Sequence, residues 1–418
     1  MNTIEKFTKV WRITGGGLIL NIDLKTGCLS NVLIQNDKEF LWTDCPGKVT
    51  VRDDLIRKTF DVCDLEHISF SQKDNTLTVT KSFKKAPWAL RETYRVVRDA
   101  IRWEAELVLD SGDFRSCAIS YHIPWPQSLR SVSFWTAREN MPSMVYRFAE
   151  IRLEYAEVTS GILIPAFCAY LEDKNVGIML AMPFDFKTPR FSFISRHQRD
   201  PELQAEFDWM ALAAGRPART SLLFRATSGN WRPALGWLYE RFREYFEPRS
   251  TFIDKLWGGH IGGTFEVSPE KARLMADLGL KWYEIHEHFP AYGNYHPEGI
   301  SQWRSGHSRE NMTLITVDMI RQTIKNLHSV GAAAMPYIQV TGDGDAKTLA
   351  PVFTSSRVLD RQGKAIYNDY YDIDQMNSDP SLPFGKDIIR QIKGIVSRYP
   401  EMDGVFLDQA CYNFLDTA

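Results

Sequence analysis

Acidic, histidine and aromatic side chains gather in the last third of the sequence, where they could form one polar site. Six of the nine histidines lie between residues 260 and 328. The sharpest single position is Asp408, which ends the short apolar run Val405-Phe406-Leu407. A carboxylate at the end of a buried strand is costly unless it is paired or functional. We therefore interpret Asp408 as a catalytic carboxylate, although helix capping or pairing with an arginine would also explain it.

Further polar residues lie at or near the ends of predicted strands, and we expect them to contact a substrate. These candidates are His260, Trp282, Glu284, His286, His288, Trp303, Asp343, Asp345 and Gln409. Alternation along a strand would place Glu284, His286 and His288 on one side. Aromatic rings of this region could stack on sugars, although simple packing would explain about half of them. They are Trp257, Trp282, Tyr292, Tyr295 and Trp303.

The pair His286-x-His288 also suggests a metal site, because two histidines on one strand face can bind one ion. A metal hydrolase using His286, His288 and Asp343 is therefore one alternative. Such a site needs three or four ligands, and no later predicted strand supplies a histidine. We expect hydrogen bonds to a polar substrate instead, with no metal and no cofactor. For His122, in the first half, a structural role is favoured over a sugar-epimerase role.

Residues 1–225 have the pattern of an antiparallel β-sandwich. Short runs rich in Val, Ile, Thr and aromatics, such as KVTVRD, TLTVTKSF and AIRWEAELVLDSG, alternate with turns rich in Gly, Asp and Asn. No stretch of this half keeps a 3.6-residue repeat. So many short strands over more than 200 residues predict a large sandwich rather than a small barrel.

The pattern changes near residue 230, where a helix is predicted over 231–247 with Asn230 as its cap. From residue 255 on, strands and helices alternate. The strand runs are LWGGHIGGTF, LKWYEIHEHF, AAAMPYIQV and DGVFLDQ, and helices are predicted at 268–278, 316–330 and 386–398. This order predicts right-handed βαβ units with a parallel sheet. Segments 290–312 and 342–385 are predicted as long loops on the same active face.

The composition excludes several classes of protein. The formal net charge is −2, so no overall basic field attracts nucleic acid or a membrane surface. No run approaches the roughly 18 apolar residues of a membrane span. No signal peptide is visible and the six cysteines are scattered, which predicts a cytoplasmic protein without a disulfide framework or a zinc site.

A sandwich, a linker helix and a (β/α) barrel with DGVFLDQ on its fourth strand together resemble the retaining α-glycoside hydrolases. The nearest groups are clan D, families 31 and 36, and the endo-α-N-acetylgalactosaminidases. The sandwich resembles the galactose-mutarotase type in architecture only. The barrel matches through DGVFLDQ and through the segment Asn377-Ser-Asp-Pro380.

The resemblance implies that Asp408 is the nucleophile, which attacks the anomeric carbon and forms a glycosyl-enzyme intermediate. A second carboxylate, the acid/base, comes from a later strand in those families, usually the sixth. The sequence departs from that pattern because it stops ten residues after Asp408. Asp416 lies too close to Asp408 to take that role, and Asp343 and Glu284 are expected to bind substrate hydroxyls.

We therefore predict three parts: a sandwich at 1–228, a linker helix at 229–250 and a partial catalytic (β/α) barrel at 251–418. A complete (β/α)8 barrel takes ~250 residues, and only about 165 follow residue 250. We expect a truncated chain, a homo-oligomer or a missing C-terminal portion. The predicted function is hydrolysis of α-linked sugars in an oligosaccharide or glycoside substrate. The alternatives are a non-catalytic carbohydrate-binding protein and the metal hydrolase described above.

Overall fold

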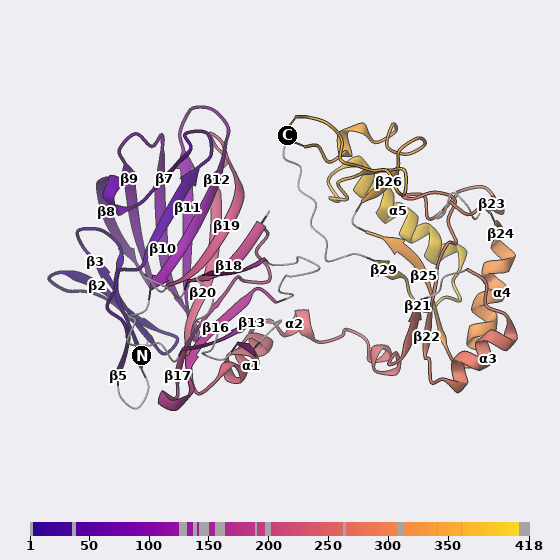
Figure 1. Cartoon of the computed structure of the whole chain (residues 1–418), viewed down its shortest axis with the longest axis horizontal. Helices are drawn as coiled ribbons and strands as arrows, with labels where there is room; N and C mark the ends of the chain where they lie inside the picture. The colour runs from indigo at the N-terminus through magenta and orange to yellow at the C-terminus, as the bar shows by residue number, and fades with distance from the viewer. Residues whose placement is uncertain are drawn as a thin grey trace. The chain divides into compact units, whose positions relative to one another are not determined.

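The computed structural model describes residues 3–35, 39–124, 132–136, 140–141, 150–154, 164–188, 190–196, 202–261, 265–306, 313–340, 342–360 and 362–408. The chain divides into two compact units, Met1–Glu247 and Pro248–Ala418. Figure 1 shows β-sheets in the first unit and alternating strands and helices in the second. Each unit contains a hydrophobic core built from its own residues.

In the described residues of the first unit, three antiparallel sheets are present. The smallest sheet has the order β1 (Thr3–Lys6), β2 (Val10–Gly15), β3 (Leu18–Asp23), β4 (Leu29–Gln35), β5 (Glu39–Thr43). The nine-stranded sheet has the order β14 (Asn140–Met141), β13 (Ser133–Thr136), β16 (Ala166–Leu171), β17 (Val176–Ala181), β20 (Ala218–Thr227), β11 (Ala100–Leu109), β10 (Trp88–Val97), β9 (Thr76–Phe83), β8 (Leu65–Lys73). The six-stranded sheet has the order β15 (Glu150–Glu154), β18 (Arg190–Arg196), β19 (Glu202–Leu212), β12 (Arg115–Pro124), β6 (Lys48–Asp53), β7 (Lys58–Phe60).

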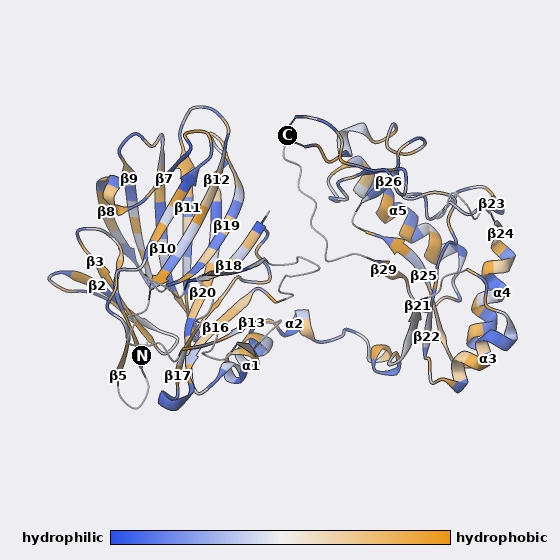
Figure 2. Ribbon diagram, in the orientation of Figure 1, coloured by the Kyte–Doolittle hydropathy of each residue, from blue (hydrophilic) through white to orange (hydrophobic). Residues whose placement is uncertain are grey.

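The two larger sheets pack face to face and confirm the predicted β-sandwich. Along β9, β10 and β11, buried residues alternate with more exposed ones, as expected when one face of each strand meets the core. The bands of orange and blue along these strands in Figure 2 show the same alternation. Trp103 on β11 meets Tyr121 on β12 edge to face, with ring centroids 4.8 Å apart, so side chains of the two sheets interdigitate.

A buried ion pair lies inside this core. Lys81 on β9 and Glu92 on β10 are 3% and 1% exposed, and Lys81 Nζ lies 2.5 Å from Glu92 Oε1. The Tyr94 hydroxyl and the Trp103 indole N–H also donate to Glu92, at 3.0 and 3.1 Å. The carboxylate is therefore satisfied on both oxygens, which is the condition for burying a charge.

The helix predicted after residue 230 is seen as α1 (Trp231–Arg241) and α2 (Arg243–Phe246), and both lie in the first unit. The Asn230 side chain caps α1 by accepting from the Arg232 N–H at 3.0 Å. Ala234 and Leu238 of α1 are buried in a cluster with residues of β16 and β17. The apolar face of α1 thus covers part of the nine-stranded sheet.

In the second unit, four strands form one parallel sheet. Its order is β21 (Gly259–Ile261), β22 (Trp282–Ile285), β25 (Ala333–Gln339), β29 (Phe406–Asp408). The helices between successive strands are α3 (Pro269–Asp277), α4 (Val317–His328) and α5 (Pro383–Arg398). These strands and helices lie where the sequence predicts βαβ units. Within the described residues the sheet is open, so the predicted barrel stays a prediction.

Local signals explain where these helices begin. Ser268 accepts from the Lys271 N–H at 3.2 Å, and Thr316 accepts from the Met319 N–H at 3.1 Å. The third helix begins at Pro383, three residues earlier than predicted, because proline fits the first helical turn. Among the described helices, none combines the length and the apolar character that a membrane crossing requires.

The segments predicted as long loops contain small antiparallel sheets. The first segment contributes β23 (Gln302–Arg304), which pairs with β24 (Leu314–Thr316). The second contains β26 (Asp343–Asp345), β28 (Ile373–Gln375) and β27 (Tyr367–Asn368), in that order across the sheet. These strands are only two or three residues long, which is too short for a pattern of alternation to reveal them in the sequence.

Candidate functional site

The strand register assigns side chains to the two faces of the parallel sheet. Tyr337 is paired with Phe406 and Gln339 with Asp408, and paired residues of parallel strands point to the same side. The next side chains along the strands point to the opposite face. There Tyr283, Ile285, Ala334 and Ile338 are buried in the core of this unit. Asp408 and Gln339 therefore lie on the other face, on the same side as Tyr337, at the carboxyl end of their strands.

Asp408 is held by a buried tyrosine on the neighbouring strand. The Tyr337 hydroxyl lies 3.0 Å from Asp408 Oδ2 and 2.8 Å from Gln339 Oε1. Burial raises the pKa of Tyr337 far above its usual range, and Tyr295 and Asp408 add to the rise. The hydroxyl therefore keeps its proton and acts as a hydrogen-bond donor to a carboxylate that is itself only half-buried.

A second carboxylate is hydrogen-bonded to a histidine whose ring packs against the same tyrosine. Glu284, at the end of β22, is 1% exposed, and its Oε1 accepts a hydrogen bond from Nδ1 of His286. The His286 ring packs against Tyr337 with centroids 4.4 Å apart. Glu284, His286, Tyr337 and Asp408 are thus one contiguous polar chain across β22, β25 and β29.

Asp343, at the start of β26, belongs to the same region. It is buried, and burial raises its pKa to about 6; the bond from Gln375 opposes that rise and the charge of Asp408 adds to it. The Gln375 amide donates to Asp343 Oδ1 at 2.9 Å. Burial likewise raises the pKa of Tyr292, with contributions from Asp343 and Asp408. These two carboxylates and the tyrosine therefore share one electrostatic environment.

Sequence reasoning missed Tyr337, Gln339 and Gln375, which contact the predicted site residues directly. The first two could have been found, because they alternate on the site face of the predicted strand AAAMPYIQV and lie at its carboxyl end. Gln375 lies in a three-residue strand within a predicted loop. No signal in the sequence separates it from the neighbouring polar residues.

Other predicted site residues lie away from this polar chain. Trp282 is the first residue of β22 and stacks on Phe406 with centroids 5.8 Å apart, at the amino ends of the strands. The Trp303 indole N–H donates to the His288 carbonyl at 2.9 Å. Asp345 accepts from the N–H groups of Lys347 and Thr348 at 3.2 and 2.7 Å, and so caps a turn.

His288 also takes part in internal bonding. It is 1% exposed, and its Nε2 lies 2.8 Å from the Tyr337 carbonyl. Burial lowers its pKa to about 4, so the imidazole is neutral at physiological pH. Glu287, just before it, has a φ of +52°, which interrupts the alternation of the strand after Ile285. His288 therefore does not follow Glu284 and His286 as strand parity predicted.

The side chains of two predicted site residues fall outside the described part of the structure. Gln409 falls outside the described residues. His260 lies on β21 and its backbone pairs with Tyr283, but its side chain is not described. Within the described residues, no three His, Cys, Asp or Glu side chains converge as metal ligands. His286 bonds to Glu284 and His288 to a carbonyl, an arrangement that does not favour the metal alternative.

The comparisons with known proteins agree with the fold. No family model matches the sequence, and no curated protein is similar to it. Solved structures are similar over 95% of the chain. One is the α-N-acetylgalactosaminidase NagBb from Bifidobacterium bifidum bound to Gal-NHAc-DNJ, with a TM-score of 0.61 and 12% identity over 68% of its length.

Two further similar structures are galactosidases. The GH36 α-galactosidase AgaB from Geobacillus stearothermophilus has a TM-score of 0.57 and 11% identity, with 64% of its length covered. The galactosidase domain of AgaSK has a TM-score of 0.55 and 9% identity, with 65% covered. The chain thus spans about two thirds of the length of these proteins. At such identities the likeness establishes a GH36-like α-glycosidase fold.

Proposed function

We propose that the chain is a retaining α-glycosidase that acts on α-linked galactosides or N-acetylgalactosaminides, with Asp408 as its nucleophile. One observation carries the proposal: Asp408 stands at the carboxyl end of a parallel strand, half-buried and bonded to Tyr337, in a chain of GH36-like fold. The carboxyl ends of parallel strands are where (β/α) barrels hold their catalytic groups. The similar enzymes act on α-galactosides and α-N-acetylgalactosaminides, as their names state.

In the proposed mechanism, an Asp408 carboxylate oxygen attacks the anomeric carbon and the aglycone oxygen leaves. This forms a covalent glycosyl-enzyme ester, which water then hydrolyses. Tyr337 orients the nucleophile through its hydroxyl, and Glu284 fixes His286 beside that tyrosine. Asp343 and Gln375 supply a buried acceptor and a buried amide for substrate hydroxyls. A second carboxyl group protonates the leaving oxygen and then takes a proton from the attacking water.

A substrate whose leaving group needs no proton tests Asp408 without the acid/base. α-Galactosyl fluoride is such a substrate, and we expect the chain to release fluoride from it. Asp408→Gly should reduce that release at least 10³-fold, because the nucleophile is lost. Added azide should then restore turnover and give β-galactosyl azide, since the small anion attacks from the vacated face. Fluoride electrode readings and NMR of the sugar product measure both effects.

The matched control is Asp360→Asn in the same unit. Asp360 accepts from the backbone N–H groups of Gln362 and Lys364, both at 2.9 Å, and an asparagine oxygen can accept the same bonds. This variant should release fluoride at the parent rate. Equal activity of the parent and Asp408→Gly would disprove the proposal. Sugar affinity without any fluoride release would favour the non-catalytic carbohydrate-binding alternative.

A further inference from the structure

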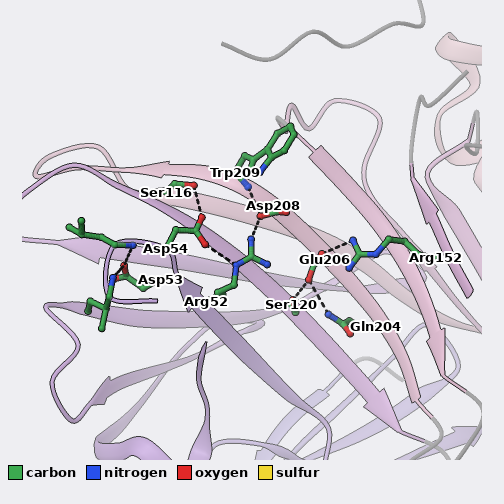
Figure 3. Close-up of polar contacts among 12 residues, drawn as sticks. Arg52, Asp53, Asp54, Ser116, Ser120, Arg152, Gln204, Glu206, Asp208 and Trp209 are labelled. Carbon is green, nitrogen blue, oxygen red and sulfur yellow. Dashed lines mark hydrogen bonds and ion pairs between the residues drawn. The ribbon is translucent and has the colours of Figure 1, made fainter. Parts of the chain in front are cut away.

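A β-bulge in the first unit changes the direction of two neighbouring side chains. Cys117 on β12 pairs with Met210 on β19, but Ile119 pairs with Phe207, so Asp208 and Trp209 together oppose the single residue between them. Phe207 and Met210 both point into the sandwich core. Asp208 and Trp209 are therefore the two residues of the bulge. Figure 3 shows both side chains on one side of the strands. Bulges commonly re-aim side chains beside functional sites.

The bulge carries backbone strain at Trp209. Its φ is +57°, in the left-handed region that bulky residues rarely adopt. Such a conformation costs ~1–2 kcal/mol, and it persists only where the surrounding structure enforces it. Here Asp208 Oδ1 accepts from the Trp209 N–H at 2.9 Å, and the Arg190 guanidinium lies 4.8 Å from the centre of the indole ring. The fold therefore holds this ring at the sheet surface at a cost in stability.

A polar network extends from the bulge across the same sheet (Figure 3). Arg52 on β6 joins Asp54 at 2.9 Å to Asp208 at 2.5 Å. Farther along, Arg152 on β15 lies 2.8 Å from Glu206 Oε1. The other oxygen of Glu206 accepts from Ser120 and Gln204, each at 3.3 Å. This network consists of two neighbouring groups, Arg52 with Asp54 and Asp208, and Arg152 with Glu206, and Ser120 and Gln204 lie at its margin.

One buried atom of this network lacks a partner. Gln204 is 4% exposed, and within the described residues its Oε1 accepts no hydrogen bond. A buried acceptor left unsatisfied costs ~1–3 kcal/mol, so such atoms mark places where another group is expected to donate. The side chains of Arg52 and Arg152 are 39% and 38% exposed, so their guanidinium groups are within reach of a ligand.

The charges of this surface identify the class of ligand. Three guanidinium groups, of Arg52, Arg152 and Arg190, balance the three carboxylates of Asp54, Glu206 and Asp208. A balanced surface has no net field to select a phosphate or a cation. It offers donors and acceptors in alternation, which suits hydroxyl groups because each hydroxyl both donates and accepts. An aromatic face beside such groups can pack against the C–H groups of a sugar ring.

We propose that the outer face of the six-stranded sheet, centred on Trp209 and the network of Arg52, Arg152, Glu206 and Asp208, binds a neutral oligosaccharide. Trp209 packs against one sugar ring, and Arg52, Arg152 and Gln204 bond to hydroxyls of that ring and of the rings that follow it along the sheet. This surface lies in the first unit and uses none of the residues assigned to glycoside cleavage. It therefore goes beyond the proposed function and does not depend on it.

The test uses the full chain carrying Asp408→Asn, so that hydrolysis cannot consume the probe. Melibiose, maltotriose and cellotriose are titrated separately by isothermal calorimetry. Trp209→Gly should weaken the binding of at least one of them more than 10-fold, because the ring is lost. Its melting temperature should stay level or rise, since glycine adopts φ +57° without strain. Loss of affinity without loss of stability distinguishes a binding role from a structural one.

Two further variants complete the design. Phe7→Ala is the control: Phe7 is 45% exposed elsewhere in the first unit and also has a cation near its ring, the Arg12 guanidinium at 5.0 Å. Its affinity should equal that of the parent. Gln204→Met keeps the size of the side chain but removes the amide, and it should also weaken binding. This second variant tests the site even if Trp209→Gly does not fold. The proposal is overturned if no probe binds, or if Trp209→Gly and Gln204→Met bind as the parent does. If probe binding depends on Trp209 but the parent chain releases no fluoride from α-galactosyl fluoride, this proposal is supported and the proposed glycosidase function is rejected.

Discussion

Two carboxylates of the second unit, Asp408 and Asp343, differ in how deeply they are buried. Asp408 is half-buried and receives a bond from Tyr337, whereas Asp343 is 4% exposed and is bonded by the Gln375 amide. Burial raises the pKa of Asp343 to about 6, so the unfolded chain loses this proton at a lower pH than the folded chain does. Ionisation of Asp343 therefore costs stability as pH rises from the ordinary aspartate range through 6, and above 6 the whole cost is present.

Asp343→Asn should remove that cost. The asparagine oxygen still accepts the Gln375 bond, but no charge is buried. Two pKa units correspond to about 3 kcal/mol, so we expect the variant to be more stable than the parent by up to that amount at pH 7.5 and equal to it at pH 4. Urea unfolding at the two pH values measures the difference. A variant that loses stability at pH 7.5 would show that ionised Asp343 has a compensating partner.

At the scale of strands and helices, capping and alternation predicted much of the second unit. Ser268 and Thr316 cap the helices that the sequence indicates there, and the four parallel strands lie in the predicted runs. The alternation of side chains along a strand also predicted that Glu284 and His286 lie on one side, and their side chains are hydrogen-bonded. It failed at His288, because the positive φ of Glu287 ends the alternation. A single backbone angle of this kind depends on tertiary packing, which the local sequence pattern does not encode.

Tertiary contacts also explain the bonds of other candidates. Trp303 was predicted to contact substrate, yet its N–H donates to a carbonyl fifteen residues earlier. That bond exists only because β23 packs beside the segment that follows β22. The Tyr337–Asp408 bond spans 71 residues and needs β25 and β29 to be neighbours. The sequence could predict both strands but not the contacts that their pairing creates.

The buried pair of the first unit gives a prediction for the sheet β9–β10–β11. Lys81→Met should destabilise the unit by about 3–5 kcal/mol, because it leaves the Glu92 charge buried without its cation. The matched control is Lys58→Met, whose Nζ lies at the same 2.5 Å from Asp64 but on a side chain that is 42% exposed. Its loss should cost less than about 1 kcal/mol. Thermal unfolding followed by near-UV circular dichroism compares them, and equal losses would refute the assignment.

At the scale of the whole molecule, the two units have separate cores and meet in sequence at an exposed segment. Residues 248–250 are exposed, and Arg249 is among them. We expect brief trypsin treatment to cut first after Arg249 and to leave a fragment that retains the far-UV spectrum of a β-sandwich. Mass spectrometry identifies the cut, and Arg249→Gln should delay it. Early cuts within 1–247 would contradict the division into units.

The order of strands in the second unit has a consequence for how the chain folds as it leaves the ribosome. The sheet runs β21, β22, β25, β29, so each strand binds the one made before it. Each strand–helix pair can therefore dock as soon as it emerges, and the sheet grows at one edge. The first unit has the opposite character, because Leu107 on β11 pairs with Ala218 on β20 across more than a hundred residues. Its nine-stranded sheet stays incomplete until residue 227 has been synthesised, which makes the first unit the slower to form although it is translated first.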